Sequence, residues 1–130
     1  MTASPPIIGK TVALNSSDLA AKLKALGPGS HVIGMADGHH DACVLTGVNT
    51  GGTITVVAEN PGRSIFDRLH AGSGAKNIIF DGLDGLPKKK VTRNANRTQT
   101  YCFAALRGSA GITFQNGTIR GRSDASDAPF

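Results

Sequence analysis

Aromatic and acidic residues are scarce in this chain. Its 130 residues include no Trp, one Tyr and five Phe, and Glu59 is the only Glu. Seventeen glycines indicate a chain rich in turns, in which Thr, Val and Ile supply most of the apolar character. This composition favours β-structure over a helical bundle, and the length predicts one domain with a modest core.

Long apolar runs and closely spaced cysteines are also missing. No apolar stretch approaches the length of a membrane span, so we expect no membrane insertion. Residues 1–17 lack a basic region followed by a continuous apolar core, so no secretory signal is predicted. Cys43 and Cys102 match no metal or redox spacing. We expect two free thiols buried in the interior, with a disulfide as the alternative.

The chain carries a net charge of +5, and basic residues concentrate in one polar segment, Lys88–Gln99, which reads KKKVTRNANRTQ. A positive surface favours an acidic partner, such as an anionic polysaccharide, lipopolysaccharide or nucleic acid. The segment lacks the interleaved aromatic residues on which bases stack, so nucleic acid is not the partner we expect.

The most informative stretch is residues 53–83, TITVVAENPGRSIFDRLHAGSGAKNIIFDGL. The β-branched residues of Thr53–Ala58 predict a strand, and the sequence Asn-Pro-Gly at 60–62 predicts a tight turn. Two more short strands are predicted at Ser64–Phe66 and Asn77–Phe80, with a turn between them at Gly72–Gly74. Short strands and sharp turns without intervening helices favour a coil of parallel strands, one layer per circuit of the chain.

One helix is predicted, at Ser16–Leu26. Ser16 or Ser17 is expected to cap its start. Its apolar stripe consists of Leu19, Leu23 and Leu26. Gly27 is expected to end the helix in the left-handed conformation, and Pro28 prevents its continuation. A helix here would cover the apolar core of the first layer, which is otherwise open.

The remaining strands are predicted at Thr11–Leu14, Ser30–Ala36, Ala42–Leu45, Thr100–Leu106, Gly111–Phe114 and Thr118–Arg120. The sequence IIFDG at 78–82 is similar to ITFQNG at 112–117, 34 positions later, which indicates a repeat of one layer. Such a layer takes about 20 to 25 residues, so the excess is assigned to a loop at residues 88–99. Residues 1–15 are interpreted as an arm with a short first strand, and residues 16–130 as the coil.

The sequences of these segments resemble those of a known family. TITVVAENPG, SIF and NIIFDGL are similar to the first rungs of right-handed parallel β-helix proteins, and SSDLAAKLKALGPGSHVIGMADGHH is similar to their capping helix and first strand. This superfamily includes pectate-lyase-like and alginate- or chondroitin-lyase-like enzymes, and the β-helical tailspikes and tail fibres of bacteriophages. The resemblance implies an all-β fold: a right-handed parallel β-helix of few rungs with an N-terminal capping α-helix.

The candidate binding residues are the basic ones of the loop and of the following turn: Lys88, Lys89, Lys90, Arg93, Arg97, Arg120 and Arg122. In lyases of this family a Lys/Arg pair neutralises a uronate carboxylate and abstracts the C5 proton, beside acidic residues that bind calcium. Those residues come from later rungs than this chain reaches. We therefore assign no catalytic residue and no cofactor, and expect Ca²⁺ only if the chain belongs to a lyase.

Two smaller groups of polar residues are further candidate sites. His39, His40 and Asp41 resemble a metal-ligand cluster, but neighbours on an extended backbone point to opposite faces. We expect surface turn residues there and no metal site. Asp81 and Asp84 lie in turns, and the sequence does not reveal whether they approach one another as a glycosidase pair would.

The resemblance leads to one main interpretation and two alternatives. The main one is a non-catalytic structural or receptor-binding component of a phage tail, of the tailspike or tail-fibre type, located in the virion after assembly in the host cytoplasm. Its partners would be an acidic bacterial surface glycan or neighbouring virion subunits, and it would form a homo-oligomer such as a trimer. The first alternative is the N-terminal part of a polysaccharide lyase acting on an acidic polysaccharide, secreted or periplasmic if a signal peptide was removed. The second is a bacterial β-helix binding module.

The C-terminal residues predict one further property. Residues 123–130, SDASDAPF, do not resemble a cap for the end of a coil. An uncovered last rung exposes strand edges that pair readily with other chains. We therefore expect either further rungs of a longer protein or another chain to cover that end.

Overall fold

The computed structural model describes residues 11–87 and 103–119, which contain one helix and eleven short strands. The elements are β1 (Thr11–Ala13), α1 (Ser16–Lys24), β2 (Gly29–Met35), β3 (Gly38–His40), β4 (Cys43–Leu45), β5 (Gly51–Ala58), β6 (Ser64–Phe66), β7 (Leu69–Ala71), β8 (Lys76–Asp81), β9 (Asp84–Gly85), β10 (Phe103–Ala105) and β11 (Ala110–Gln115). The predicted all-β class, with a single short helix near the start, is confirmed for these residues.

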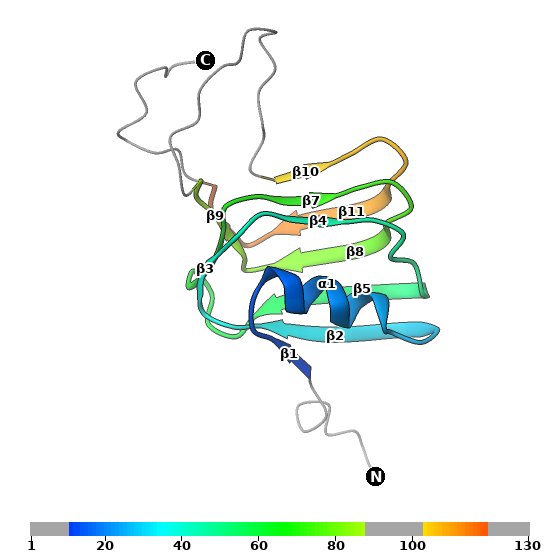
Figure 1. The fold of residues 1–130 in the computed structure, drawn as a ribbon, viewed down its shortest axis with the longest axis horizontal. Coiled ribbons are helices and arrows are strands. Elements are labelled where there is room, and N and C mark those ends of the chain that lie inside the picture. The colour runs from blue at the N-terminus through cyan, green and yellow to red at the C-terminus, as the bar shows by residue number, and fades with distance from the viewer. Residues whose placement is uncertain (1–10, 88–102, 120–130) are drawn as a thin grey trace, which may run out of the picture.

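The strands form three sheets in which every pairing is parallel. Sheet 1 has the order β1-β2-β5-β8-β11, sheet 2 the order β3-β6-β9 and sheet 3 the order β4-β7-β10. From β2 onward the chain visits sheets 1, 2 and 3 in turn and then returns to sheet 1. Each such passage, called a circuit below, lies on the one before it (Figure 1).

The register between circuits agrees with the repeat seen in the sequence. In sheet 1, Val56 pairs with Ile33 and with Phe80, at separations of 23 and 24 positions. Ile78 pairs with Ile112, 34 positions later, as predicted from the similarity of IIFDG to ITFQNG. The same inward positions therefore stack from circuit to circuit although the circuits differ in length.

The core is formed by the inward side chains of all three sheets together with α1. Alternate residues of β5 are buried, as expected for a strand with one face inside. The largest fully buried side chains are Phe66, Phe80, Leu19, Leu23, Met35, Leu45, Ile54, Leu69, Ile78, Leu83, Val48 and Val56. Each inward side chain packs against those of the circuits before and after it. Its burial therefore depends on both neighbouring circuits.

The two turns predicted inside the central stretch are present. At 60–62, the Arg63 N–H donates to the carbonyl oxygen of Asn60 over 3.0 Å, and Gly62 has φ +84°, as a type II turn requires. In the second turn Gly74 has φ +83°, and a Cβ there would lie 3.1 Å from the Cα of Gly47 in the circuit below. Glycine is therefore needed at 74 both for the backbone conformation and for the close approach of two circuits.

Helix α1 confirms the predicted stripe but not the predicted caps. Leu19 and Leu23 are buried, and Leu26 packs partly against the core. The cap at the start is Asn15, whose Oδ1 accepts from the Asp18 N–H over 2.9 Å, so the prediction of Ser16 or Ser17 was wrong. The prediction that Gly27 ends the helix in the left-handed conformation was also wrong. Gly27 lacks a positive φ, and the first described glycine that has one is Gly29.

Together β1 and α1 cover the N-terminal end of the core. Strand β1 pairs with β2 in sheet 1, and α1 lies against β4 (Figure 1). The buried Ser16 donates its hydroxyl to the carbonyl oxygen of Asp41 over 2.5 Å, which anchors the start of the helix beside β4. Leu19 and Leu23 of this helix belong to the buried core. Among the described residues no helix is long and apolar enough to cross a membrane.

Three strands were missing from the prediction: β3, β7 and β9. They contain Gly, His or Asp, residues with low strand propensity, and each has at most three residues. Their pairing with the neighbouring circuit holds them, and single-sequence propensity does not contain that information. At 118–120, where a strand was predicted, the described residues show only one bridge, between Gly85 and Ile119.

Candidate functional site: inter-circuit carboxylates and an apolar end

The seven basic residues predicted to bind a ligand, Lys88, Lys89, Lys90, Arg93, Arg97, Arg120 and Arg122, lie outside the described residues. Their place in the fold is known only through the elements on either side in sequence. Leu69 of β7 pairs with Cys43, 26 positions earlier, and with Phe103, 34 positions later. The longer separation falls in the circuit that contains the basic segment, between β9 and β10.

Carboxylate–amide pairs join neighbouring circuits where the strands of sheet 1 end. Asn60 Nδ2 donates to both carboxylate oxygens of Asp37, over 2.9 and 3.2 Å. Two circuits further on, Asp81 accepts from Asn116 Nδ2 over 3.0 Å and from Gln115 Nε2 over 3.3 Å. Each pair links residues from two successive circuits, so these side chains hold the turns of the coil in register.

Asp84 has a similar role in the interior. It is buried, and its Oδ1 accepts from the backbone N–H of Thr118 over 3.0 Å. A buried carboxylate that accepts a backbone N–H compensates part of its desolvation through that bond. The sequence left open whether Asp81 and Asp84 act as an acid–base pair. The structure shows both engaged as acceptors for residues of the next circuit.

The two histidines predicted to face apart do so. His39 is exposed, with its Nε2 2.6 Å from the carbonyl oxygen of Leu86. His40 is 6% exposed, its Nε2 lies 2.8 Å from the carbonyl oxygen of Ala36, and its ring packs on Phe66 at 5.1 Å between centroids. The interpretation of both as surface turn residues was therefore wrong for His40, because β3 is a strand whose alternate residue points inward. Within residues 11–87 and 103–119, no group of three or more His, Cys, Asp or Glu side chains is arranged to hold a metal ion.

Cys43 is free and buried, as predicted, while Cys102 lies outside the described residues. Burial raises the pKa of the Cys43 thiol to about 11, because the thiolate would lose its hydration. Its sulfur donates weakly to the carbonyl oxygen of Ser16 over 3.7 Å. Near neutral pH this thiol is protonated and unreactive, so it belongs to the packing beneath α1.

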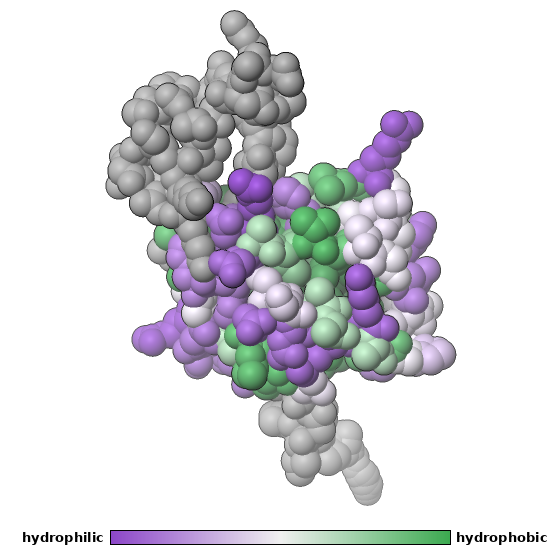
Figure 2. All heavy atoms as spheres, in the orientation of Figure 1, coloured by the Kyte–Doolittle hydropathy of each residue, from purple (hydrophilic) through white to green (hydrophobic). Residues whose placement is uncertain are grey.

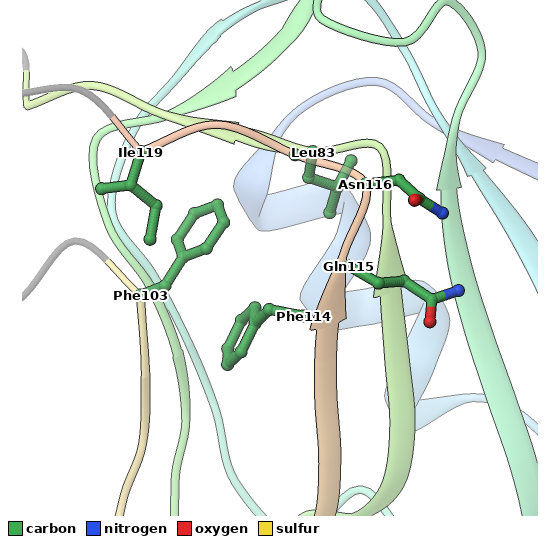
Figure 3. A pocket seen from close by; sticks show the side chains of 7 residues that line it. Leu83, Phe103, Phe114, Gln115, Asn116 and Ile119 are labelled. Carbon is green, nitrogen blue, oxygen red and sulfur yellow. The ribbon is translucent and has the colours of Figure 1, made fainter.

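A cavity of about 130 Å³ opens at the opposite end of the core. It is lined by Leu83, Phe103, Phe114, Gln115, Asn116, Gly117 and Ile119. Figure 3 shows Phe103, Phe114 and Ile119 pointing into one shared space beside Leu83. The sequence predicted an uncovered end in this region, but it did not reveal that the apolar lining would form a hollow.

A second apolar area lies on the side of the coil. Val44 of β4 is 54% exposed. Figure 2 shows apolar side chains gathered in the middle of the face on which α1 and β4 lie in Figure 1, with hydrophilic side chains around them. Val44 has an exposed fraction similar to that of Ile119, 54% against 59%, so it serves below as a comparison position for the end of the core.

No family model, curated protein or solved structure matches the chain. Its function is therefore inferred from the arrangement itself. The order in which successive circuits pass through three parallel sheets carries that inference, and the polar side chains that join the circuits support it.

Proposed function

We propose that this chain folds as a right-handed parallel β-helix of few rungs and serves as a non-catalytic structural and receptor-binding component of a phage tail, of the tailspike or tail-fibre type. In this role the coil is a rigid support, and the segment between β9 and β10 is displayed to an acidic bacterial surface glycan or to a neighbouring virion subunit. The single observation that carries the proposal is that successive circuits of the chain add one parallel strand to each of three sheets in the same order.

The β-helical part of the proposal is supported by topology and handedness rules. Successive strands of sheet 1 are joined by crossovers that pass through sheets 2 and 3. Connections between parallel strands of one sheet are nearly always right-handed, because of the twist of the strands. The helix and β1 cover the first circuit as a terminal cap does in a solenoid.

The supporting role is favoured by how the carboxylates are used. Asp37, Asp81 and Asp84 each accept hydrogen bonds from the following circuit. Side chains committed to such bonds hold the coil rigid, and rigidity is what a display scaffold needs. The separation of 34 positions between Leu69 and Phe103 is eight residues longer than the 26 between Cys43 and Leu69. Loops carried on a rigid support are the usual position of recognition residues.

Binding to an anionic glycan tests the proposal. The chain would be titrated against acidic bacterial surface polysaccharides, and compared with a variant carrying Lys88→Gln, Lys89→Gln and Lys90→Gln. A control variant with Lys24→Gln, Arg63→Gln and Arg68→Gln removes the same charge from three exposed positions elsewhere. We expect about tenfold or greater loss of affinity in the first variant and little loss in the control, with binding weakened by salt.

Three results decide between the proposals. Binding that depends on the three lysines, without change of the polymer, supports the tail component. Equal losses in the two variants would mean that net charge alone attracts the glycan, and would contradict a display role for the segment. Release of unsaturated uronate from the polymer would contradict the non-catalytic proposal and favour the alternative, a polysaccharide lyase.

A further inference from the structure

The last described circuit ends in an apolar surface, here called the end face, made of Phe103, Ile112, Phe114 and Ile119. Inward residues that stack from circuit to circuit form columns, here called ladders. Phe103, Ile112 and Phe114 stack on Leu69, Ile78 and Phe80 of the previous circuit. Those three partners are at most 1% exposed, whereas Phe103, Ile112 and Phe114 are only partly buried and Ile119 is 59% exposed. The cavity of about 130 Å³ opens on this face (Figure 3).

The backbone of the last circuit also has unpaired strand edges among the described residues. Strand β11 is the last strand of sheet 1, and β10 is the last strand of sheet 3. Among the described residues, nothing pairs with the outer edge of either strand. A strand edge next to an apolar surface is a template for further strand pairing.

Charge indicates what kind of partner fits. Arg107 is the only charged residue between Phe103 and Ile119, although the whole chain carries +5. A charged partner finds no complement on such a surface. The four residues that define the end face are themselves uncharged, so two copies of the face can meet without opposing like charges.

We infer that two copies of this chain associate end to end through the end face, related by a twofold axis. A twofold axis makes the two β11 edges run antiparallel, which is an ordinary strand pairing, and makes the contact self-complementary. Phe114 already stacks against Phe80 and Phe103, with ring centroids 5.1 and 5.0 Å apart. The second copy would bury the open side of this aromatic stack and close the cavity. The inference uses residues 103–119 only and does not depend on the tail proposal.

Sedimentation equilibrium of the full chain over a range of concentrations tests the contact. We expect a monomer–dimer equilibrium that Ile119→Asp weakens about tenfold or more, because an unpaired carboxylate would be buried at the contact. The matched control is Val44→Asp on β4, a position with a similar exposed fraction, 54% against 59%. It should leave the dissociation constant within about twofold. Both positions are exposed, and unfolding midpoints verify that the variants fold.

A second substitution and the effect of salt sharpen the test. Ile119→Lys should also weaken self-association, because it would place an unpaired ammonium group at the contact. Salt separates this contact from glycan binding. End-to-end association persists or strengthens with salt as the +5 charges are screened, whereas binding of an anionic polymer weakens.

Four results would overturn the inference. They are a monomer at every concentration, a trimer, a dimer that Val44→Asp dissociates while Ile119→Asp does not, and β11 amides equally protected from hydrogen exchange in dilute monomer and in concentrated solution. The last would mean that some other part of the chain covers the edge.

Discussion

The two ends of this coil are built from the same ladders and differ in what lies beyond them. At the first end, β1 and α1 cover the core, and the inward residues Ile33, Met35 and Leu45 are at most 2% exposed. At the other end, Phe114 continues the ladder of Ile33 and is only partly buried. The residue type is as apolar at the second end as at the first. Burial of an inward side chain therefore depends on the neighbouring circuit, and each circuit stabilises the next.

The largest expected effect compares two phenylalanines of one ladder. Phe80 is 1% exposed and Phe114 is its partner in the next circuit. We expect Phe80→Ala to lower the free energy of unfolding by about 3–5 kcal/mol, because it leaves a cavity between two circuits. Phe114→Ala should cost about 1–2 kcal/mol, since its ring is only partly buried. Urea unfolding of both variants in dilute solution measures the difference, and equal losses would mean that the second end is covered after all.

A backbone contact between the first two circuits gives the next effect. A Cβ on Gly52 would lie 2.7 Å from the carbonyl oxygen of Gly29 and from the nitrogen of Ser30. Gly52→Ala should therefore destabilise the chain by about 1–3 kcal/mol, as overpacking does. Gly27→Ala is the control, because a Cβ there meets nothing within 4 Å. Thermal unfolding of both variants checks the prediction, which fails if Gly52→Ala unfolds like the control.

Removal of the helix cap should loosen the covered end alone. Asn15→Ala takes away the acceptor for the Asp18 N–H and should cost about 1 kcal/mol. Cys43 lies beneath α1, and its thiol reports this loosening directly. In a Cys102→Ser background, disulfide-exchange labelling of Cys43 should be slow in the parent chain, whose thiol pKa is raised to about 11, and faster in Asn15→Ala. An unchanged labelling rate would show that the helix does not protect the core.

The smallest effect is a dependence on acid at the same end. The hydrogen bonds from Lys22 and from the Leu14 N–H lower the pKa of Asp18 below its ordinary value of 3.8. A lowered folded-state pKa means that the stabilisation is present above pH 3.8 and is lost as the pH falls through the lower folded value. Asp18→Asn should thus unfold more easily than the parent chain near neutral pH, and the difference in melting temperature should vanish in strong acid. A difference that persists there would point to packing instead of charge.

The long strands could be predicted from the sequence because local preference and tertiary pairing agree there. The β-branched residues of Thr53–Ala58 favour a strand, and every second residue, Ile54, Val56 and Ala58, is buried. The observed strand extends only two residues further, to Gly51. The similarity of IIFDG to ITFQNG predicted a real pairing of Ile78 with Ile112. Repetition of a layer carries long-range information that single-strand propensity lacks.

The remaining errors share a cause. Ser16 looked like a helix cap, but its hydroxyl bonds the carbonyl oxygen of Asp41, so Asn15 caps the helix. His40 looked like a turn residue, but pairing of β3 with β6 turns it inward onto Phe66. In each case the deciding contact joins residues more than twenty positions apart, and only the folded chain brings them together.

The candidate site could be predicted less well than the fold. The acceptor roles of Asp37 and Asp81 depend on which amide lies above each of them, and that follows from the register between circuits. The end face could not be predicted because it depends on the pairing of β11 with β8, which places the partly exposed Phe114 above the buried Phe80. The basic residues from Lys88 to Arg97, and Arg120 and Arg122, remain a prediction from the sequence.

The unequal length of the circuits has a consequence for variation and engineering. Cys43 and Leu69 are 26 positions apart while Leu69 and Phe103 are 34 apart, yet the pairing resumes in the same ladders. The entropy of closing a loop grows only logarithmically, by about 0.6 kcal/mol for each doubling of its length. The corner between sheets 2 and 3 can therefore gain or lose residues with little change in the free energy of folding. A foreign peptide grafted there would be carried by the coil without shifting a single ladder.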